Sequence, residues 1–337
     1  MTQTLAQNPP SATSPACALL LDQCADLELD LALVSVNRRT IRLHGPHGEP
    51  IEVWLEHSRY SMLEQVFRQL RFDFSDLPLL TRGDSKELRL LTPRVIAAKL
   101  LPTVYSFTQN RYGVAPGTDE LRARFSAEIF RAMECSPGSR YLASAFLALH
   151  ESEAGPLLIE RLVQSCNLEV RAKRYHIGSP VHRYRYTEKH PTANNGAPVT
   201  RWMRFEQPVI CFDWRHPLTD EDGTRLSDEP ISDDYAALWI DDVASAKRLV
   251  RDTFYWLEER FATHGVALID FCLFVDRSGK VVFGEISPDC MRVRHAANDD
   301  ADALDKDTWR AGGSPAGVLQ KYQALFNIVI GDDSVTE

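Results

Sequence analysis

Apolar residues along the chain follow two different spacings, which predict a mixture of helices and strands. Spacings of three and four residues predict helices over 60–72, 118–133, 243–261 and 318–330. Alternation of apolar and polar residues predicts a small antiparallel meander over 27–55, and further strands over 87–91, 95–101, 141–149, 157–163 and 209–212. The first half is therefore expected to form a mixed sheet with one helix packed against it.

The most informative stretch is residues 266–292, VALIDFCLFVDRSGKVVFGEISPDCMR. Two apolar runs flank a polar loop with a glycine, residues 276–280, and this arrangement predicts a β-hairpin. Asp270 and Glu285 lie inside the apolar runs, and a buried carboxylate is costly unless a cation, a metal or several donors compensate it. Alternation places Asp270, Cys272 and Phe274 on one face of the first strand. A metal or nucleotide site and a satisfied structural acid are both open interpretations of this face.

The N-terminal quarter has no catalytic character. Residues 1–25 are rich in Ala, Ser, Thr, Pro and Gln and are expected to form a flexible tail, in which residues 18–21 are the one candidate for a short helix. Residues 26–78 are expected to form a small added β/α module with an interaction or scaffold role. The polar loops 194–198 and 218–231 are candidate lids over a cleft.

Composition narrows the class of protein. The chain has 337 residues, 44% apolar and 25% charged, which suffices for a substantial core in about two domains. No apolar run approaches the ~20 residues that cross a bilayer, and no secretion signal is recognisable, so a cytoplasmic protein without membrane association is expected. The net charge of −9 argues against sequence-independent binding of nucleic acid. Seven cysteines without a C-x-x-C pair predict reduced thiols.

Residues 168–186 concentrate basic side chains in an otherwise acidic protein, namely Arg171, Lys173, Arg174, Arg183 and Arg185. The interleaved tyrosines would also suit stacking on single-stranded nucleic acid. A compact anion site is favoured, because the cluster is one segment and Gly178-Ser179 supplies a backbone and a hydroxyl donor that can close around one phosphate. A solvated basic loop is the remaining alternative.

The turn 82–86, RGDSK, precedes a predicted strand. A glycine turn with a nearby lysine can cover nucleotide phosphates, because backbone amides and an ammonium both complement them. Such a turn is more often only a turn, so this signal is weak by itself.

Five motifs, in their order along the chain, resemble the SAICAR synthetase family: Gly83-x-x-Lys86, Glu169-x-x-x-Lys173, Ile269-Asp270-Phe271, Glu285-x-Ser287-Pro288-Asp289-x-x-Arg292 and Asp305-Lys306-Asp307-x-x-Arg310. The resemblance implies an α+β fold of two lobes with a kinase-like or ATP-grasp-like cleft. Residues 79–167 would form the N-terminal lobe, and residues 168–337 the C-terminal lobe with the substrate and metal site. It also implies an ATP-dependent carboxylate–amine ligase, in which Mg²⁺-assisted phosphoryl transfer forms an acyl phosphate that an amine attacks.

The resemblance assigns roles to individual residues. It implies a catalytic role for Lys86, Asp270 and Glu285, and binding of Mg²⁺ by Asp270 and Glu285. It implies that ATP is bound by Gly83, Ser85, Lys86, Glu169 and Asp270. It implies that the substrate is bound by Lys173, Arg174, Ser179, Asp289, Arg292 and Arg310. The expected partners are small molecules, a phosphorylated heterocyclic carboxylate and an amino acid such as aspartate. The oligomeric state is left open, with a homodimer as one option.

Several departures from the family pattern predict a variant activity. Where the family has a second lysine in the glycine turn, this chain has Asp84, and where the family has an arginine, this chain has Lys173. Where the family has the run D-F-K-x-E, this chain has Cys272 and Phe274. The family's D-E pair corresponds to Gly284-Glu285. The leading hypothesis is a ligase acting on an imidazole- or pyrazole-type nucleotide carboxylate in specialised metabolism. The alternative is a nucleotide-binding or substrate-binding protein that has lost its chemistry, and a kinase is a weaker third option.

Overall fold

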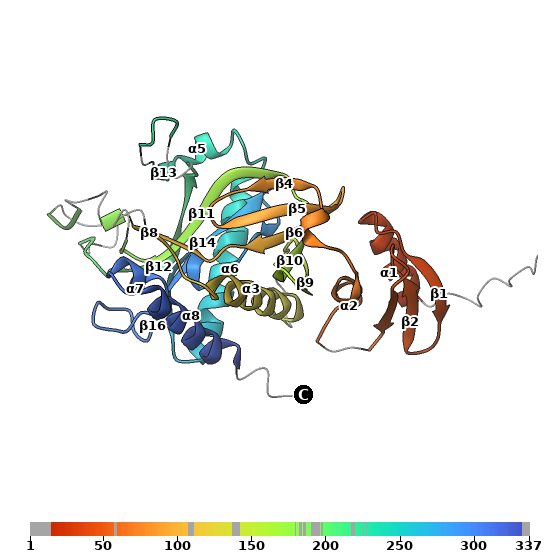
Figure 1. Cartoon of the computed structure of the whole chain (residues 1–337). Coiled ribbons are helices and arrows are strands. Elements are labelled where there is room, and N and C mark those ends of the chain that lie inside the picture. The colour runs from red at the N-terminus through yellow and green to blue at the C-terminus, as the bar shows by residue number, and fades with distance from the viewer. Residues whose placement is uncertain are drawn as a thin grey trace, which may run out of the picture. The chain divides into compact units, whose positions relative to one another are not determined.

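The chain folds into two compact units, each of which is described by itself (Figure 1). The computed structural model describes residues 15–56, 59–106, 111–136, 142–178, 180–181, 184, 187–189, 196, 198–216, 220–224, 226 and 228–331. The first unit contains the described residues up to Arg82 together with Glu87–Lys99 and Phe146–Leu162. The second contains Gly83–Lys86, Leu100–Ala145 and the chain from Val163 onward. Within the described residues, no helix is both long enough and apolar enough to span a membrane.

The first unit contains two antiparallel sheets and two helices. Strands β1 (Ala32–Val36), β2 (Thr40–His44) and β3 (Pro50–Trp54) form one sheet, which confirms the predicted meander. The other sheet has the order β4-β5-β6-β10-β9, with β4 (Leu79–Arg82), β5 (Lys86–Thr92), β6 (Val95–Leu100), β9 (Phe146–Ser152) and β10 (Gly155–Arg161). Helices α1 (Pro15–Asp26) and α2 (Met62–Gln69) and the 3-10 turn η1 (Phe74–Asp76) complete the unit.

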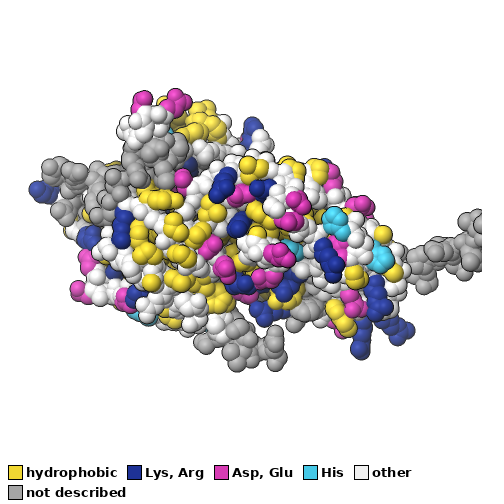
Figure 2. Space-filling model, viewed as in Figure 1, with side chains coloured by type: hydrophobic (Ala, Val, Ile, Leu, Met, Phe, Trp, Pro, Cys, Tyr) yellow, Lys and Arg dark blue, Asp and Glu magenta, His cyan; other side chains and the backbone are white. Residues whose placement is uncertain are grey.

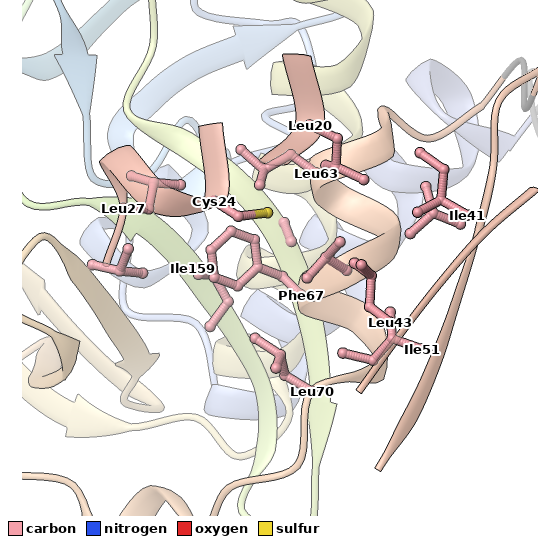
Figure 3. Close-up of a cluster of buried hydrophobic side chains, with 14 of the residues drawn as sticks. Leu20, Cys24, Leu27, Ile41, Leu43, Ile51, Leu63, Phe67, Leu70 and Ile159 are labelled. Atoms are coloured by element: carbon pink, nitrogen blue, oxygen red, sulfur yellow. The ribbon is translucent and has the colours of Figure 1, made fainter. Parts of the chain in front are cut away.

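One hydrophobic core holds this unit together (Figure 3). Cys17, Leu20 and Cys24 of α1 are buried in it with Phe67 of α2 and Ile159 of β10. The flexible tail predicted for residues 1–25 is therefore corrected from residue 15 on, because α1 buries an apolar face; residues 1–14 lie outside the described residues. The core also joins the predicted added module to strands assigned to the first lobe. The first compact unit follows this packing. The division at residues 26–78 and 79–167 stays a prediction.

The second unit is built on a twisted antiparallel sheet of the order β13-β12-β11-β14-β15, with β16 also paired to β14. Its strands are β11 (Ser165–Tyr175), β12 (Arg204–Trp214), β13 (Glu229–Ile231), β14 (Ala267–Asp276), β15 (Val282–Phe283) and β16 (Met291–Arg294), and a separate pair is β7 (Thr103–Ser106) and β8 (Arg111–Val114). Its helical elements are α3 (Thr118–Cys135), η2 (Thr187–Lys189), α5 (Asp233–Ala236), α6 (Val243–Thr263), η3 (Pro288–Cys290), α7 (Asp307–Arg310) and α8 (Pro315–Val329). The helices predicted over 118–133, 243–261 and 318–330 are confirmed as α3, α6 and α8.

The two faces of this sheet have different partners. Helix α6 packs against β11, β12 and β14, and Phe254 of α6 stacks on Phe271 of β14 at a centroid distance of 5.7 Å (Figure 1). The apolar positions of β11 and β14 point to this helix, as alternation requires. Charged side chains occupy the other face, and they form the candidate site.

The predicted hairpin is confirmed, but its second strand is short. β14 pairs with β15 through Phe274 opposite Phe283 and Val275 opposite Val282. Gly284 has a φ of +86°, which ends the strand. Glu285, predicted to lie in the second strand, therefore lies outside it. The chain then returns as β16 and pairs with the other end of β14.

Candidate functional site

The centre of the site is a buried group of three charges on the β11–β14 sheet face. Lys173 and Arg292 occupy register positions opposite Asp270, on β11 and β16 respectively. Lys173 Nζ and Arg292 NH1 each donate to Asp270 Oδ2 at 2.6 Å. Burial alone would raise the pKa of the Asp270 carboxyl, but Arg292 and Lys173 outweigh it and hold the pKa well below its usual range. Two cations thus satisfy the acid in the apolar strand.

Asp307 extends this group toward the C-terminus. It accepts hydrogen bonds from Arg292 Nε at 3.3 Å, Arg294 NH2 at 2.9 Å and Arg310 NH1 at 2.5 Å. Burial opposes ionisation of Asp307, but Arg292 and Arg310 lower its pKa to about 2. Three guanidinium groups around one carboxylate leave an excess of positive charge. This is the chemistry that binds a phosphate or carboxylate.

Asp305 contacts the backbone of Asp307, and its pKa is shifted in the opposite direction. Its oxygens accept hydrogen bonds from the backbone N–H of Val293 at 2.7 Å and of Asp307 at 2.6 Å. Burial, together with the negative charge of Asp307, raises the pKa of Asp305 to about 7. Between the pKa values of Asp307 and Asp305, Asp305 keeps its proton while Asp307 is ionised.

Gly178 permits a close approach of the backbone to Arg292. Its φ is +75°, and a Cβ at this position would lie 2.9 Å from Arg292 NH1. A larger residue would both strain the backbone and push the guanidinium aside. Of the predicted donor pair Gly178-Ser179, only the glycine can be placed, because Ser179 lies outside the described residues.

A second buried group forms around Glu285. Arg122 of α3 donates two hydrogen bonds to it, Nε to Oε2 at 3.0 Å and NH2 to Oε1 at 2.6 Å. Ser287 Oγ donates to Oε2 at 2.8 Å. Burial would raise the pKa of Glu285, but Arg122, and to a smaller extent Lys86, lower it. Asp289 lies nearby and accepts hydrogen bonds from Lys306 Nζ at 3.0 Å and Tyr322 Oη at 2.8 Å.

Sequence reasoning missed Arg122. In the predicted helix 118–133, Arg122 lies three residues before the apolar Phe125 and so falls on the same side of the helix. That spacing was the available signal. Its partner could not be identified, because it is 163 residues away in the sequence.

A third group surrounds the ring of Phe274. Lys86 Nζ lies 5.5 Å from the ring centroid, and Arg215 Cζ lies 5.6 Å from it. The turn before Lys86 is fixed by two hydrogen bonds, from Leu101 N to Ser85 O at 2.9 Å and from Gly83 N to Lys86 O at 2.9 Å. Of the predicted nucleotide residues in this turn, Lys86 is thus adjacent to the site face of β14, and Gly83 and Ser85 belong to the turn that positions it.

Glu169 of β11 holds Arg215 beside Phe274. It lies opposite Phe274 in the register and accepts hydrogen bonds from Arg171 NH2 at 2.8 Å and Arg215 NH1 at 3.0 Å. Burial opposes ionisation of Glu169, but Arg171 and Arg215 lower its pKa. Arg215 was not recognised in the sequence, because it lies between the predicted strand 209–212 and the predicted loop 218–231.

Arg174 is not brought together with the other predicted substrate residues. It neighbours Lys173 in β11 and so points to the opposite face, where Nε donates to Glu258 Oε1 of α6 at 2.6 Å and NH2 donates to Glu258 Oε2. The alternative of a solvated basic loop is also excluded for Arg171, Lys173 and Arg174, since all three lie in a central strand. On the face shown in Figure 2, basic and acidic side chains are interspersed.

The geometry does not fit a magnesium ion held by Asp270 and Glu285. Asp270 already accepts from two cations, and both oxygens of Glu285 accept from Arg122. Among the described residues, no group of three or more His, Cys, Asp and Glu side chains could hold a metal ion. Mg²⁺ requires oxygen ligands in near-octahedral geometry, whereas Asp270 Oδ2 and both oxygens of Glu285 already accept from cationic donors.

Comparison with known proteins gives one consistent relationship. Residues 106–324 match the SAICAR synthetase family. A SAICAR synthetase (Type-2) in complex with ADP is 19% identical and has a TM-score of 0.58, over 74% of this chain and 97% of that one. The phosphoribosylaminoimidazole-succinocarboxamide synthase from Ehrlichia chaffeensis is 17% identical with a TM-score of 0.58, over 74% of this chain and 98% of that one. These structures are similar in fold.

A curated relative is similar in sequence. The bifunctional cordycepin biosynthesis cluster protein 3 of Cordyceps militaris is 23% identical over 294 residues, which is 74% of this chain and 32% of the relative. The chain therefore spans about a third of the length of that relative.

Proposed function

Because the chain belongs to the SAICAR synthetase family, we propose that it is an ATP-dependent ligase that joins a carboxylate to an amine. The observation that carries the proposal is the arrangement of the charged sheet face. Lys86 and Glu169 lie at the Phe274 end of β14, whereas Arg292 and Arg310 lie at the other end, around Asp270 and Asp307. One face can thus hold a nucleotide next to an anionic second substrate.

The reaction would proceed in two steps. A carboxylate oxygen of the substrate attacks the γ-phosphorus of ATP, the bond from that phosphorus to the bridging oxygen breaks, and ADP leaves. The amine then attacks the acyl carbon, the bond from carbon to the phosphate oxygen breaks, and inorganic phosphate leaves while the nitrogen loses a proton. We assign Lys86 to the charge on the transferred phosphoryl group, and Arg292 and Arg310 to the anionic groups of the second substrate.

Asp270 and Glu285 would act in this scheme through the cations they hold. Asp270 positions Lys173 and Arg292, and Glu285 pairs with Arg122 and also interacts electrostatically with Lys86. The proposed second substrate is a phosphorylated imidazole- or pyrazole-type nucleotide carboxylate, and the proposed amine is an amino acid such as aspartate. The relative from a cordycepin biosynthesis cluster supports a role in specialised metabolism.

The test is to incubate the protein with ATP, the carboxyaminoimidazole ribonucleotide and aspartate, with and without Mg²⁺, and to measure ADP and amide product. ADP and amide from a related carboxylate but not from this one would support the specialised ligase. Normal turnover of the carboxyaminoimidazole ribonucleotide would overturn the specialised substrate. Phosphorylated product without amide would indicate a kinase. Lys86→Met should abolish product, whereas Lys280→Met, at an exposed hairpin lysine, should not.

A second candidate is a nucleotide-binding or substrate-binding protein without chemistry. The observation that favours it is that Asp270 and Glu285 are both engaged by buried cations, while Phe274 and Gly284 stand at acidic positions of the family pattern. Product that disappears in Glu285→Gln, in a preparation shown to be folded, would eliminate this candidate. Nucleotide binding with no product from any carboxylate would favour it.

A further inference from the structure

Two cations lie close to the ring of Phe274, which stands where the family pattern has an acidic residue. Lys86 Nζ and Arg215 Cζ lie 5.5 and 5.6 Å from the centroid of Phe274. Cation–π attraction operates at these distances, so the ring stabilises both groups without neutralising either. A carboxylate at position 274 would instead form ion pairs with them.

The ammonium of Lys86 is available to an anion. No hydrogen bond or ion pair of this ammonium is found within the described part of the chain, and its one specific contact is the Phe274 ring. Gly284 leaves the space beside it open, since a Cβ there would lie 3.4 Å from Lys86 Nζ and 3.6 Å from Phe274 Cδ2. The second acidic position of the family pattern therefore also presents no carboxylate to this lysine.

Arg215 is held in place but keeps donors for a ligand. One NH group donates to Glu169 at 3.0 Å, and the Nε atom lies 3.6 Å from Asp228 Oδ1. The side chain is partly exposed, and a guanidinium has five N–H donors. Glu169 is shared with Arg171, so it does not neutralise Arg215 alone.

From these contacts we infer that Lys86 and Arg215 bind the polyphosphate of a nucleoside triphosphate in place of a magnesium ion, so that nucleotide binding does not depend on magnesium. The inference rests on the proposed function, because it concerns the same nucleotide site. A polyphosphate must be neutralised by a metal or by basic side chains, and an ammonium with a guanidinium supplies the second kind of neutralisation. Lys86 has no ion pair within the described residues, and Arg215 shares Glu169 with Arg171. These two cations attract the free nucleotide more strongly than the magnesium complex, which carries two fewer negative charges.

The test is isothermal titration of the protein with ATP, once in EDTA and once in excess MgCl₂. We expect the affinity in EDTA to equal or exceed the affinity with magnesium. Lys86→Met and Arg215→Met should each weaken ATP binding by about tenfold and weaken adenosine binding by less than about twofold. Thermal unfolding of each variant establishes that it is folded.

Position 274 provides a matched pair of variants. Phe274→Glu places a carboxylate between the two cations, and ATP binding should then be at least about tenfold tighter with magnesium than in EDTA. Phe274→Leu removes the ring without adding charge, and binding should remain independent of magnesium.

The outcomes separate this inference from the proposed function. ATP binding to the unaltered protein that is lost in EDTA and restored by magnesium would overturn the inference and leave the ligase proposal in place. No ATP binding in either solution would overturn the nucleotide site of the proposed function and the inference with it. Equal loss of ATP and adenosine binding in Lys86→Met would assign this lysine to the fold and would also overturn the inference.

Discussion

Lys173 and Asp270 face each other across β11 and β14, and their side chains meet at 2.6 Å although they are 97 residues apart in the sequence. Arg292 contacts the same oxygen of Asp270 at the same distance. One carboxylate therefore holds a buried lysine and a partly buried arginine from two different strands. Its charge is needed for the fold as well as for the site.

Asp270→Asn should destabilise the protein strongly. The substitution keeps the shape of the side chain but leaves Lys173 buried without a counter-charge and leaves Arg292 with Asp307 alone. Breaking a buried ion pair costs about 3–5 kcal/mol. We expect a loss of this order in the free energy of unfolding, measured by denaturant titration at pH 7. Glu259→Gln, at an exposed position of α6, is the control and should change stability by less than about 0.5 kcal/mol. A loss below about 1 kcal/mol in Asp270→Asn would contradict the arrangement of charges.

Arg122 and Glu285 should behave as one energetic unit. Arg122→Met leaves Glu285 buried and unpaired, and Glu285→Met leaves Arg122 in the same condition, so each single variant should lose about 3–5 kcal/mol. In the double variant neither charge is left behind, and the total loss should be smaller than the sum of the single losses by at least about 2 kcal/mol. Denaturant unfolding of the four proteins gives this coupling energy. Additive losses would show that the two groups do not interact.

Asp305 should give the protein an unusual dependence on pH. In the unfolded chain its carboxyl ionises near the ordinary pKa of about 3.9, whereas in the folded protein it keeps its proton until its pKa of about 7. Between these values the folded state binds more protons, so this group makes the free energy of unfolding fall as pH rises. Above pH 7 and below pH 4 its contribution no longer changes.

Comparing Asp305→Asn with the unaltered protein isolates that contribution. Asparagine cannot titrate, so the part of the decline between about pH 4 and 7 that belongs to Asp305 should disappear, up to about 4 kcal/mol. The variant also loses one of the two backbone hydrogen bonds, because an amide NH₂ cannot accept, and the slope is therefore the quantity to compare. Asp300→Asn, an exposed neighbour, should leave the slope unchanged. An unchanged slope in Asp305→Asn would place the pKa of this carboxyl in its ordinary range.

The sequence was sufficient to identify residues that violate a local pattern. Asp270 stands out because it interrupts an apolar strand, and the need for a compensating partner follows from the cost of burying its charge. The identity of the partner does not follow, because strand register and strand order are set by packing over long distances. Arg122 and Arg215 were not recognised, because their partners lie far from them in the sequence. Arg174 was grouped with Lys173, although adjacent residues of a strand point to opposite faces. The short helix considered for residues 18–21 is confirmed within α1, but its full extent was not predicted, because its buried face forms only against residues from α2 and β10.

Gly178→Ala should impair the binding of the second substrate more than it impairs folding. The φ of +75° costs an L-residue about 1–2 kcal/mol, and the new Cβ would lie 2.9 Å from Arg292 NH1. The guanidinium must then move away from its place between Asp270 and Asp307. We expect the KM for the phosphorylated carboxylate to rise about tenfold or more, while ATP binding at the Phe274 end stays within about twofold.

Gly265→Ala is the matched control for this prediction. Gly265 has nearly the same φ, +73°, but no atom lies within 4 Å of the position that a Cβ would take. Its substitution therefore adds the backbone strain without the clash, and it should lower the free energy of unfolding by about 1–2 kcal/mol with the KM unchanged. An equal rise of KM in both variants would assign the effect to general loss of stability. A rise confined to Gly178→Ala would establish that Arg292 must occupy its observed position for the substrate to bind.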